Sequence, residues 1–408
     1  MQTGPFGTQL KASEYVDKGI PVINVRNIGF GDVKKEDLEY LNDAKAEKLH
    51  QHHLRKGDIV FGRKGAVERH ALIDETVDGW IQGSDCLRLR IRSQDICERY
   101  LSHYFKTKAH QDWMQALCSF GATMSSLNQD IVRRISFPAP PIIVQKKITA
   151  TLTAYDKLIE NNQRRIALLE KMAEEIYREW FVRLRFPGHE KVKKVKGVPE
   201  GWQRTKVVTL TSYLKRGVAP QYDDLAEGFA INQKCIRDGK LDLSFARHQS
   251  RDVSADRQIR FGDVLVNSTG EGTLGRVAQV LTQLSNCIVD SHVTIVRPKH
   301  NVPIHYFGMT LKAWEVHFST MGRGATNQTE LSPTVIGNIE VTMPSKPLQD
   351  VFESHAEPLF AQITYLTAQN ERLTRMRDLL LPRLISGKLS VEQLDIRFPP
   401  GMEESACV

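Results

Sequence analysis

The feature that most constrains the fold of this chain is an internal repeat. The segment LRKGDIVFGRKG at residues 54–65 matches IRFGDVLVNSTG at residues 259–270, an offset of 205 positions. Further along, the offset becomes 207, and Arg90 then falls on Arg297. Both offsets are close to half of the 408 residues. The sequence therefore predicts two similar halves in tandem.

Each half is predicted to contain a β-rich part followed by a long helix. Short apolar runs bounded by Gly, Asn and Asp indicate strands, for example GDIVFG and CLRLRIR in the first half and GDVLVN and SHVTIVR in the second. Some helix is mixed in, around ERYLSHYFKTKAHQDWMQAL. The expected fold class is α+β, with two β-rich domains in a tandem pseudo-repeat.

The helical stretches carry a heptad pattern. In the first half, the positions that follow one another at steps of four and three are Leu152, Tyr155, Ile159, Asn162, Ile166, Leu169, Ala173, Ile176 and Trp180. In the second half, the matching positions are Leu359, Leu366, Gln369, Leu373, Met376 and Leu380. So long a seam needs a partner helix, and we expect the two helices to pair as an antiparallel coiled coil. Asn162 and Gln369 put one polar residue on each seam, which can fix the register.

Proline and glycine mark the expected ends of these helices. Pro358 is expected to interrupt or start the second helix, and Pro382 followed by Gly387 to end it. The predicted organisation is a first β-rich domain, a helical region, a basic linker, a second β-rich domain, a second helical region and a tail, at residues 1–141, 142–186, 187–200, 201–347, 348–386 and 387–408. Forty helical residues would rise roughly 60 Å, so the helices could set the distance between two DNA half-sites. The same geometry would equally suit a dimeric protein partner or a bivalent scaffold.

Composition limits the class of protein. The formal charge of +8 and a pI near 9.1 favour a polyanionic partner without requiring one. The sequence has no apolar run long enough for a membrane span and no leader-like start, so we expect no membrane association and a cytoplasmic protein. The six cysteines lie far apart and form no C-x-x-C pair, which predicts reduced thiols rather than a zinc site or a disulfide framework.

Several segments together carry a family resemblance. They are GPFGTQLKASEYVDKGIPVINVRNI near the start, the two GD[IV] segments, FPAPPIIVQKKITATLTAYDKLIENNQRRIALLEKMAEEIYREWF in the middle and LLLPRLISGKLSVEQLD near the end. With them, the chain resembles, over nearly its whole length, the specificity subunit of type I restriction-modification systems.

The resemblance implies a non-catalytic, DNA-binding subunit. Each β-rich domain would be a target-recognition domain that reads one half of a bipartite double-stranded DNA sequence. The helices would set the spacer and dock two modification subunits, which methylate adenine with S-adenosylmethionine. Restriction subunits, when present, would add translocation and cleavage that depend on ATP and Mg. No cofactor is expected in this chain itself.

One departure from the pattern concerns the start of the first domain. The second domain is introduced by VPEGWQRTKVVTLTSYLKRG, whereas the first begins almost at once with MQTGPFG. We therefore expect the first domain to lack the equivalent opening strand, either because the true start lies upstream or because the domain is rearranged. An unpaired sheet edge there would impair its folding.

Three groups of loop residues recur in both halves and are candidates for DNA contacts, because bases and phosphates need donors and acceptors on exposed loops. In the first half they are Thr8, Gln9 and Lys11; Arg63, Lys64 and Arg69; and Thr123, Ser125, Ser126 and Asn128. In the second half they are Arg216 and Gln221; Ser268, Thr269 and Arg276; and Arg323, Thr326, Asn327 and Gln328.

Other motifs have a structural and a functional interpretation. A charged linker is a slightly better interpretation than a phosphate-binding site for the lysine run Lys191, Lys193, Lys194 and Lys196. HQHH at residues 50–53 has no further ligand at metal-site spacing, so we predict no metal site. FPAPP is interpreted as a rigid lead into the helix rather than a polyproline ligand. Asp58 and Asp263 are expected to form turns before buried strands.

The segment GEGTLG, residues 270–275, spells the dinucleotide-binding fingerprint G-x-G-x-x-G, and Asp290 lies at the distance of a ribose ligand. Its counterpart in the first half, RKGAVER, loses the fingerprint, so we interpret the segment as a hairpin loop and Asp290 as a strand residue. The sequence contains neither an adenine-methyltransferase motif nor a phosphate-binding loop. The alternatives to a DNA-recognition subunit are a bivalent coiled-coil protein adaptor and a nucleotide-dependent enzyme built on GEGTLG.

Overall fold

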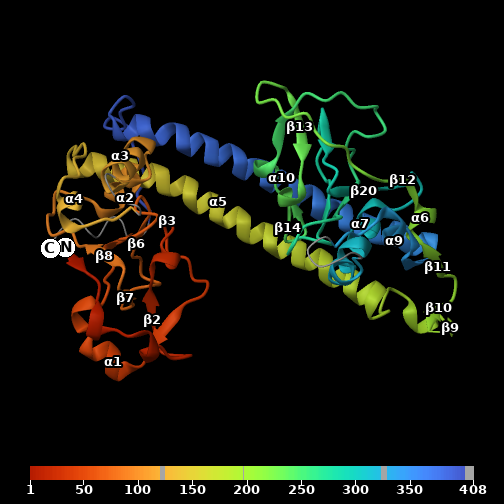
Figure 1. Cartoon of the computed structure of the whole chain (residues 1–408), viewed down its shortest axis with the longest axis horizontal. Helices are drawn as coiled ribbons and strands as arrows, with labels where there is room; N and C mark the ends of the chain where they lie inside the picture. The colour runs from red at the N-terminus through yellow and green to blue at the C-terminus, as the bar shows by residue number, and fades with distance from the viewer. Residues whose placement is uncertain (120–124, 196, 323–328, 400–408) are drawn as a thin grey trace. The chain divides into compact units, whose positions relative to one another are not determined.

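The protein was analysed as a computed structural model, which describes residues 1–119, 125–195, 197–322 and 329–399 (Figure 1). The chain divides into two compact units. The first unit comprises residues 1–160 and 370–408, and the second comprises residues 161–369. Each unit contains a β-rich part and a length of two long helices, α5 (Ile142–Tyr177) and α10 (Lys346–Ile385). Within the described residues, no helix is long and apolar enough to cross a membrane.

The first unit has two small sheets. The five-stranded sheet has the order β1 (Gln2–Thr3), β8 (Cys86–Leu89), β5 (Ile59–Gly62), β6 (His70–Leu72) and β3 (Phe30–Gly31). The three-stranded sheet has the order β4 (Glu39–Leu41), β2 (Ile20–Ile23) and β7 (Ile81–Gln82). The short helices are α1 (Asp43–Lys48), α2 (Glu98–Phe105), α3 (Lys108–Ser119) and α4 (Gln129–Arg133).

The central strand β5 contributes to two separate cores of this unit. Its residues alternate between the faces of the sheet. Ile59 and Phe61 pack with helices α2 and α3, whereas Val60 packs in a separate cluster with Ile23 and Leu54. A strand that is buried on both faces has a continuous run of apolar residues in its sequence. The run Ile59, Val60 and Phe61 is of this kind.

The second unit repeats this plan. Its larger sheet has the order β12 (Thr211–Arg216), β20 (Val293–Pro298), β17 (Val264–Asn267) and β18 (Val277–Gln279), and its three-stranded sheet has the order β16 (Arg247–Gln249), β13 (Gly228–Ile231) and β19 (Cys287–Val289). Three strand pairs complete it: β11 (Gln203–Lys206) with β21 (Glu340–Met343), β9 (Lys194–Val195) with β10 (Val198–Pro199), and β14 (Ile236–Arg237) with β15 (Lys240–Leu241). The helices are α6 (Val207–Leu210), α7 (Ile304–Ala313), α8 (Glu315–Thr320) and α9 (Pro333–Asn338).

The Gly-Asp turns occupy the same structural role in both units. The carboxylate of Asp58 accepts the backbone N–H of Arg55 at 2.8 Å and two guanidinium N–H groups of Arg90 at 2.6 and 2.7 Å. Asp263 accepts the N–H of Arg260 at 2.8 Å and is paired with Arg297 at 2.7 and 2.8 Å. Each aspartate therefore closes its own turn and binds the arginine of the neighbouring strand segment, at the end of β8 or in β20, as expected for a structural role.

Within each unit, the two long helices run antiparallel. In the first unit, Ile148 and Leu152 near the start of α5 pack with Leu381 and Leu384 near the end of α10. In the second unit, Tyr177 at the end of α5 packs with Phe352 near the start of α10. The fold class is therefore the expected one, two β-rich parts in tandem repeat carried by an antiparallel pair of helices.

Pro358 neither starts nor interrupts the second helix, contrary to expectation. Helix α10 is continuous from Lys346 to Ile385. An interior proline costs a helix roughly 3 kcal/mol. Phe352, Ala356 and Leu366 on the neighbouring turns are buried, whereas Pro358 is exposed. The packing of these buried side chains stabilises the helical conformation on both sides of the proline. The helix ends at Ile385, shortly before Gly387, which has a φ of 75°.

The two polar residues of the seam, Asn162 and Gln369, contact each other directly. In the second unit, the buried side chain of Asn162 donates from Nδ2 to Oε1 of Gln369 at 2.9 Å. Of the other expected seam residues, Leu152, Ile159 and Leu366 are buried, while Ile166, Leu169, Leu359, Leu373 and Leu380 are partly buried. Met376 is half exposed, and Leu381 rather than Leu380 is the buried residue, so the seam of α10 runs one residue later at this end than the heptads predict.

Candidate nucleic-acid interface

Two loops of the first unit meet at the level of the backbone. The N–H of Gly65 donates to the carbonyl of Ser125 at 3.2 Å, and the N–H of Leu127 donates to the carbonyl of Arg63 at 2.8 Å. Lys64 and Ser126 form an isolated β-bridge between these two bonds. The second and third candidate groups of the first half, which are far apart in sequence, are therefore one continuous surface.

The same contact recurs in the second unit. The N–H of Leu331 donates to the carbonyl of Ser268 at 2.8 Å, which is the counterpart of the bond between Leu127 and Arg63. Arg216 joins this cluster, because its guanidinium donates to the Ser268 carbonyl at 3.4 Å and pairs with Glu330 at 2.8 Å. Asn128 and Ser332 also occupy matching positions, since each caps the short helix that follows, α4 or α9.

A side-chain pair sits at equivalent positions in the two clusters, with different chemistry in each. In the first unit, Lys64 Nζ lies 3.3 Å from Asp85 Oδ1, and the N–H of Arg63 donates to the Asp85 carbonyl at 2.8 Å. In the second unit, the Thr269 hydroxyl lies 2.7 Å from His292 Nδ1, and the N–H of Ser268 donates to the His292 carbonyl at 2.8 Å. The backbone hydrogen bond is thus the same in both units, whereas the side chains at these positions differ.

Asp85 and His292 were not among the sequence candidates. The signal for them was present, because each directly follows the matched serine of the repeat, Ser84 or Ser291. The repeat alone could not reveal that this position faces the loop that follows β5 or β17. Glu330 was missed for the same reason, since its role depends on where Arg216 lies.

The arginines of these clusters are held by packing. Arg69 lies over the ring of Phe30, 5.4 Å from its centroid. The Nε atoms of Arg63, Arg69 and Arg216 are buried without a partner among the described residues. In the second unit, Arg276 donates to the carbonyl of Gly272 at 3.0 Å, across the hairpin loop. Guanidinium groups held in this way provide donors in a fixed geometry, the property used to contact phosphates and guanine edges.

The candidates Thr8, Gln9, Lys11 and Gln221 lie apart from these clusters. Gln9 belongs to a 3-10 turn at Gly7–Gln9, and the neighbouring Leu10 packs with the small sheet. The backbone N–H of Lys11 is bound by Glu14 at 2.7 Å. Gln221 accepts the N–H of Ser250, beside β16. Five further candidates, Thr123, Arg323, Thr326, Asn327 and Gln328, lie outside the described residues.

The segment GEGTLG is a hairpin loop between β17 and β18, as interpreted from the repeat. Gly270, Gly272 and Gly275 all have positive φ, of 106°, 69° and 80°. A strand rather than a helix follows the third glycine, so no helix N-terminus faces a phosphate here. Asp290 follows strand β19 directly, and its carboxylate accepts the N–H of His292 at 2.9 Å. Burial raises the pKa of Asp290. The geometry does not support a dinucleotide site.

The remaining motifs have structural explanations. The HQHH segment forms a 3-10 turn at His50–His52, and burial lowers the pKa of His52. Among the described residues, no group of three or more His, Cys, Asp or Glu side chains could hold a metal ion. In the described part of the basic linker, Lys194 belongs to a two-stranded hairpin and is exposed.

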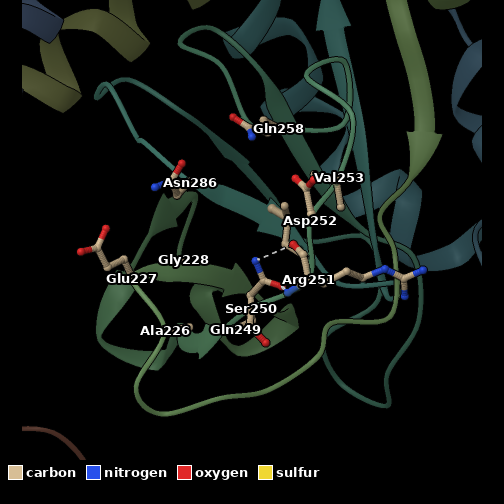
Figure 2. A pocket seen from close by; sticks show the side chains of 11 residues that line it. Ala226, Glu227, Gly228, Gln249, Ser250, Arg251, Asp252, Val253, Gln258 and Asn286 are labelled. Atoms are coloured by element: carbon tan, nitrogen blue, oxygen red, sulfur yellow. Dashed lines mark hydrogen bonds between the residues drawn. The ribbon is translucent and has the colours of Figure 1, made fainter.

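A polar hollow in the second unit lies at the edge of the three-stranded sheet (Figure 2). Gln249, which is buried at its base, accepts the N–H of Arg251 at 2.8 Å and donates to the carbonyl of Arg251 at 3.3 Å. Its amide therefore holds the shape of the turn at Arg251. The hollow is otherwise lined by exposed side chains such as Glu227 and Asn286, and it does not converge on one point.

Comparisons with known proteins agree with this architecture. A family model described as the type I restriction modification DNA specificity domain matches residues 7–171. The type I restriction enzyme MjaIX specificity subunit of Methanocaldococcus jannaschii is 25% identical over 331 residues, which cover 74% of this chain and 72% of that protein. The HindI specificity subunit of Haemophilus influenzae is 18% identical, covering 82% of this chain and 87% of that protein.

A solved structure shares the fold. The crystal structure of the type I restriction-modification S subunit from M. genitalium superposes with a TM-score of 0.61 at 15% identity, covering 94% of this chain and 92% of that one. Each unit of this chain contains a β-rich module with the same two-loop cluster. The chain is therefore similar, over most of its length, to specificity subunits of type I restriction-modification systems.

Proposed function

We propose that this chain gives a type I restriction-modification complex its DNA sequence specificity, and that each unit reads one half of a bipartite target. The observation that carries this proposal is the two-loop cluster, built on the same backbone hydrogen bonds in both units but presenting different side chains. Such an arrangement suits two modules that dock in the same way on DNA and read different bases.

The cluster supplies two kinds of contact. Arginine and lysine side chains such as Arg69 and Arg276 suit phosphate oxygens, and the overall charge of +8 adds sequence-independent attraction. The paired groups, Lys64 with Asp85 and Thr269 with His292, combine donors and acceptors in one place and suit base edges. We assign base reading to these two pairs.

The helices are proposed to dock two modification subunits. Outside the buried seam, several large apolar side chains on the helices are exposed. They are Leu158, Met376 and Leu379 in the first unit and Leu168, Met172 and Tyr365 in the second. Exposed apolar side chains repeated along a helix suit packing against partner helices. Methyl transfer from S-adenosylmethionine, and restriction with ATP and Mg, would then belong to the partner subunits.

The proposed specificity is tested by expressing the chain with the modification subunit encoded beside it and mapping methyladenine in the host genome by long-read sequencing. The expected result is a bipartite motif that appears only when this chain is present. Methylation that is unchanged when the chain is omitted would refute the proposal.

Docking is tested by Leu379→Asp, at a helix position that is 63% exposed. The substitution should leave unfolding unchanged within about 0.5 kcal/mol, because exposed sites away from special features tolerate change. It should weaken co-purification of the modification subunit. The matched control is Leu225→Asp, at a leucine of the second β-rich part that is 96% exposed, which should leave assembly intact. Equal assembly by both variants would exclude this face of the helix.

A further inference from the structure

A charged pair lies in the two-loop cluster of the second unit. Nη2 of Arg216 lies 2.8 Å from Oε1 of Glu330 and donates to the carbonyl of Ser268 at 3.4 Å. The N–H of Leu331, the residue after Glu330, donates to the same carbonyl at 2.8 Å. Glu330 is therefore held through its carboxylate by Arg216 and through the neighbouring backbone by Ser268.

This charged pair borders Thr269 and His292, the pair proposed to read bases. Ser268 donates its own N–H to the carbonyl of His292 at 2.8 Å, and the hydroxyl of Thr269 lies 2.7 Å from His292 Nδ1. The buried hydroxyl of Ser268 lies 2.6 Å from Thr294 Oγ1. Ser268 is thus fixed by several hydrogen bonds, and it joins Glu330 and His292 in one surface.

The first unit has an uncharged contact at the equivalent position. In the sheet, Arg216 lies opposite Thr294. Thr3 lies opposite Leu87, which matches Thr294 in the repeat. Thr3 therefore occupies the position of Arg216. Its hydroxyl accepts a hydrogen bond from Nε2 of Gln129 at 3.2 Å.

The acidic member of the pair is also replaced in the first unit. Ser126 occupies the position of Glu330, because it precedes the leucine that donates to the opposite loop. The same backbone hydrogen bond thus forms there without an acidic side chain at this position. The shared fold therefore does not require the ion pair.

Stability does not account for the pair either. The side chain of Arg216 is 27% exposed and that of Glu330 is 50% exposed. Ion pairs that solvent reaches to this extent contribute little to the free energy of unfolding. An exposed carboxylate also repels phosphate groups, which lowers the general affinity for DNA that the charge of +8 provides. Glu330 therefore weakens DNA binding unless it contacts a group that donates a hydrogen bond.

The chemistry of a carboxylate indicates which group this is. An ionised carboxylate only accepts hydrogen bonds, and Oε1 of Glu330 is already paired with Arg216. In the major groove, cytosine presents the donor N4, whereas guanine and thymine present acceptors. Adenine presents the donor N6 beside the acceptor N7, which repels a carboxylate. Cytosine is therefore the base that suits Glu330.

We propose that Glu330 determines specificity in the second unit by accepting a hydrogen bond from the N4 amino group of a cytosine, and that Arg216 positions its carboxylate. This inference rests on the proposed function, because it takes the second unit to read one half-site. Arg216 holds Oε1, leaves Oε2 for the base and offsets the charge of the carboxylate beside the phosphates.

The inference is tested with Glu330→Gln in the full chain, co-expressed with the modification subunit, by mapping methyladenine in the host genome. Glutamine keeps the size of the side chain but adds a donor, so it also pairs with bases that present acceptors. We expect the methylated motif to lose its preference at one position of one half-site, where the unsubstituted chain requires a G·C pair.

Synthetic duplexes that carry each of the four base pairs at this position measure the change in vitro. The preference for cytosine in the initial rate of methylation should fall at least about fivefold in Glu330→Gln. Thermal unfolding of the variant should match that of the unsubstituted chain, because the side chain is half exposed.

Two substitutions of Arg216 test its positioning role. Arg216→Ala should relax the same position of the motif, because the carboxylate loses its support, and Arg216→Lys should keep part of the preference, because it retains a cation. A merely structural contribution would instead lower methylation equally for all four base pairs. The matched control is Glu227→Gln, at an exposed glutamate beside the polar hollow of the same unit (Figure 2), which should leave the motif unchanged.

Several outcomes would overturn the inference. An unchanged motif in Glu330→Gln, relaxation at an A·T pair, or relaxation in both half-sites would each refute the role of Glu330. An equal loss of methylation on all four duplexes in Arg216→Ala would refute the positioning role. None of these results would refute the proposed function, which fails if methylation does not depend on this chain.

Discussion

At the residue scale, an aspartate–arginine ion pair lies behind the Gly-Asp turn of each unit. Asp263 is fully buried and pairs with Arg297, whose side chain is 9% exposed, whereas Arg90, the partner of Asp58, is 31% exposed. Removing one member of a buried pair leaves the other charge uncompensated.

Asp263→Ala should therefore destabilise the chain by about 3–5 kcal/mol, and Asp58→Ala by clearly less, because solvent can still reach Arg90. Urea unfolding of the two variants beside the unsubstituted chain measures the difference. The repeat makes each variant the control for the other. Equal losses would show that solvent access to the arginine does not matter.

Three histidines make the first unit sensitive to acid. Burial lowers the pKa of His70 to about 3 and of His110 to about 4, and it lowers that of His103 well below its ordinary value. Below pH 6.5, the unfolded chain takes up protons that the folded unit does not. The free energy of unfolding therefore falls as the pH drops from about 6.5 toward about 4.

His110→Phe should remove part of this acid sensitivity. The ring lies among Tyr104, Phe105 and Trp113, so phenylalanine keeps the packing and removes the titrating group. The loss of unfolding free energy between pH 7 and pH 5 should shrink by about 1–2 kcal/mol. Exposed His300, substituted by Gln, serves as the control and should leave the loss unchanged. An identical pH dependence in His110→Phe would contradict the assignment.

At the element scale, the helix pair combines a largely apolar seam with one polar contact. The hydrogen bond between Asn162 and Gln369 sits at a position where leucine would pack against leucine. Polar groups at such positions lower stability and favour one register over others.

Replacing both residues by leucine should raise the free energy of unfolding by about 1–2 kcal/mol. It should also allow more than one register, which would appear as a loss of methylation at the correct spacing when the complex is assembled. Thermal unfolding and methylation mapping check the two effects. A less stable double variant would mean that the hydrogen bond outweighs the apolar gain.

At the scale of the whole molecule, the repeat predicts that the two half-sites are read independently. Asp85 belongs to the first cluster and His292 to the second, in equivalent backbone frames. His292→Ala should relax one half of the methylated motif and leave the other half unchanged, and Asp85→Ala should do the reverse. A direct base contact typically contributes about 1–3 kcal/mol of discrimination.

The measurement is methyladenine mapping of both variants in the same host. Its control is Ser250→Ala, at an exposed position beside the polar hollow, which should leave the motif intact. A variant that relaxes both halves at once would contradict independent reading.

The sequence determined the large features of this protein, because they depend on periodicity. Repeats, heptads and Gly-Asp turns are set by residue spacing, so the tandem units, the antiparallel helices and the hairpin nature of GEGTLG could be predicted. The exact seam of α10 could not, since Leu380 and Leu381 are equally apolar and only packing against Ile148 and Leu152 selects between them.

The tertiary structure alone decided which side chains work together. Asp85 and His292 carry no motif, and they face the candidate loops only because their strands lie next to β5 and β17. Helix α10 continues through Pro358 because core contacts outweigh a local preference.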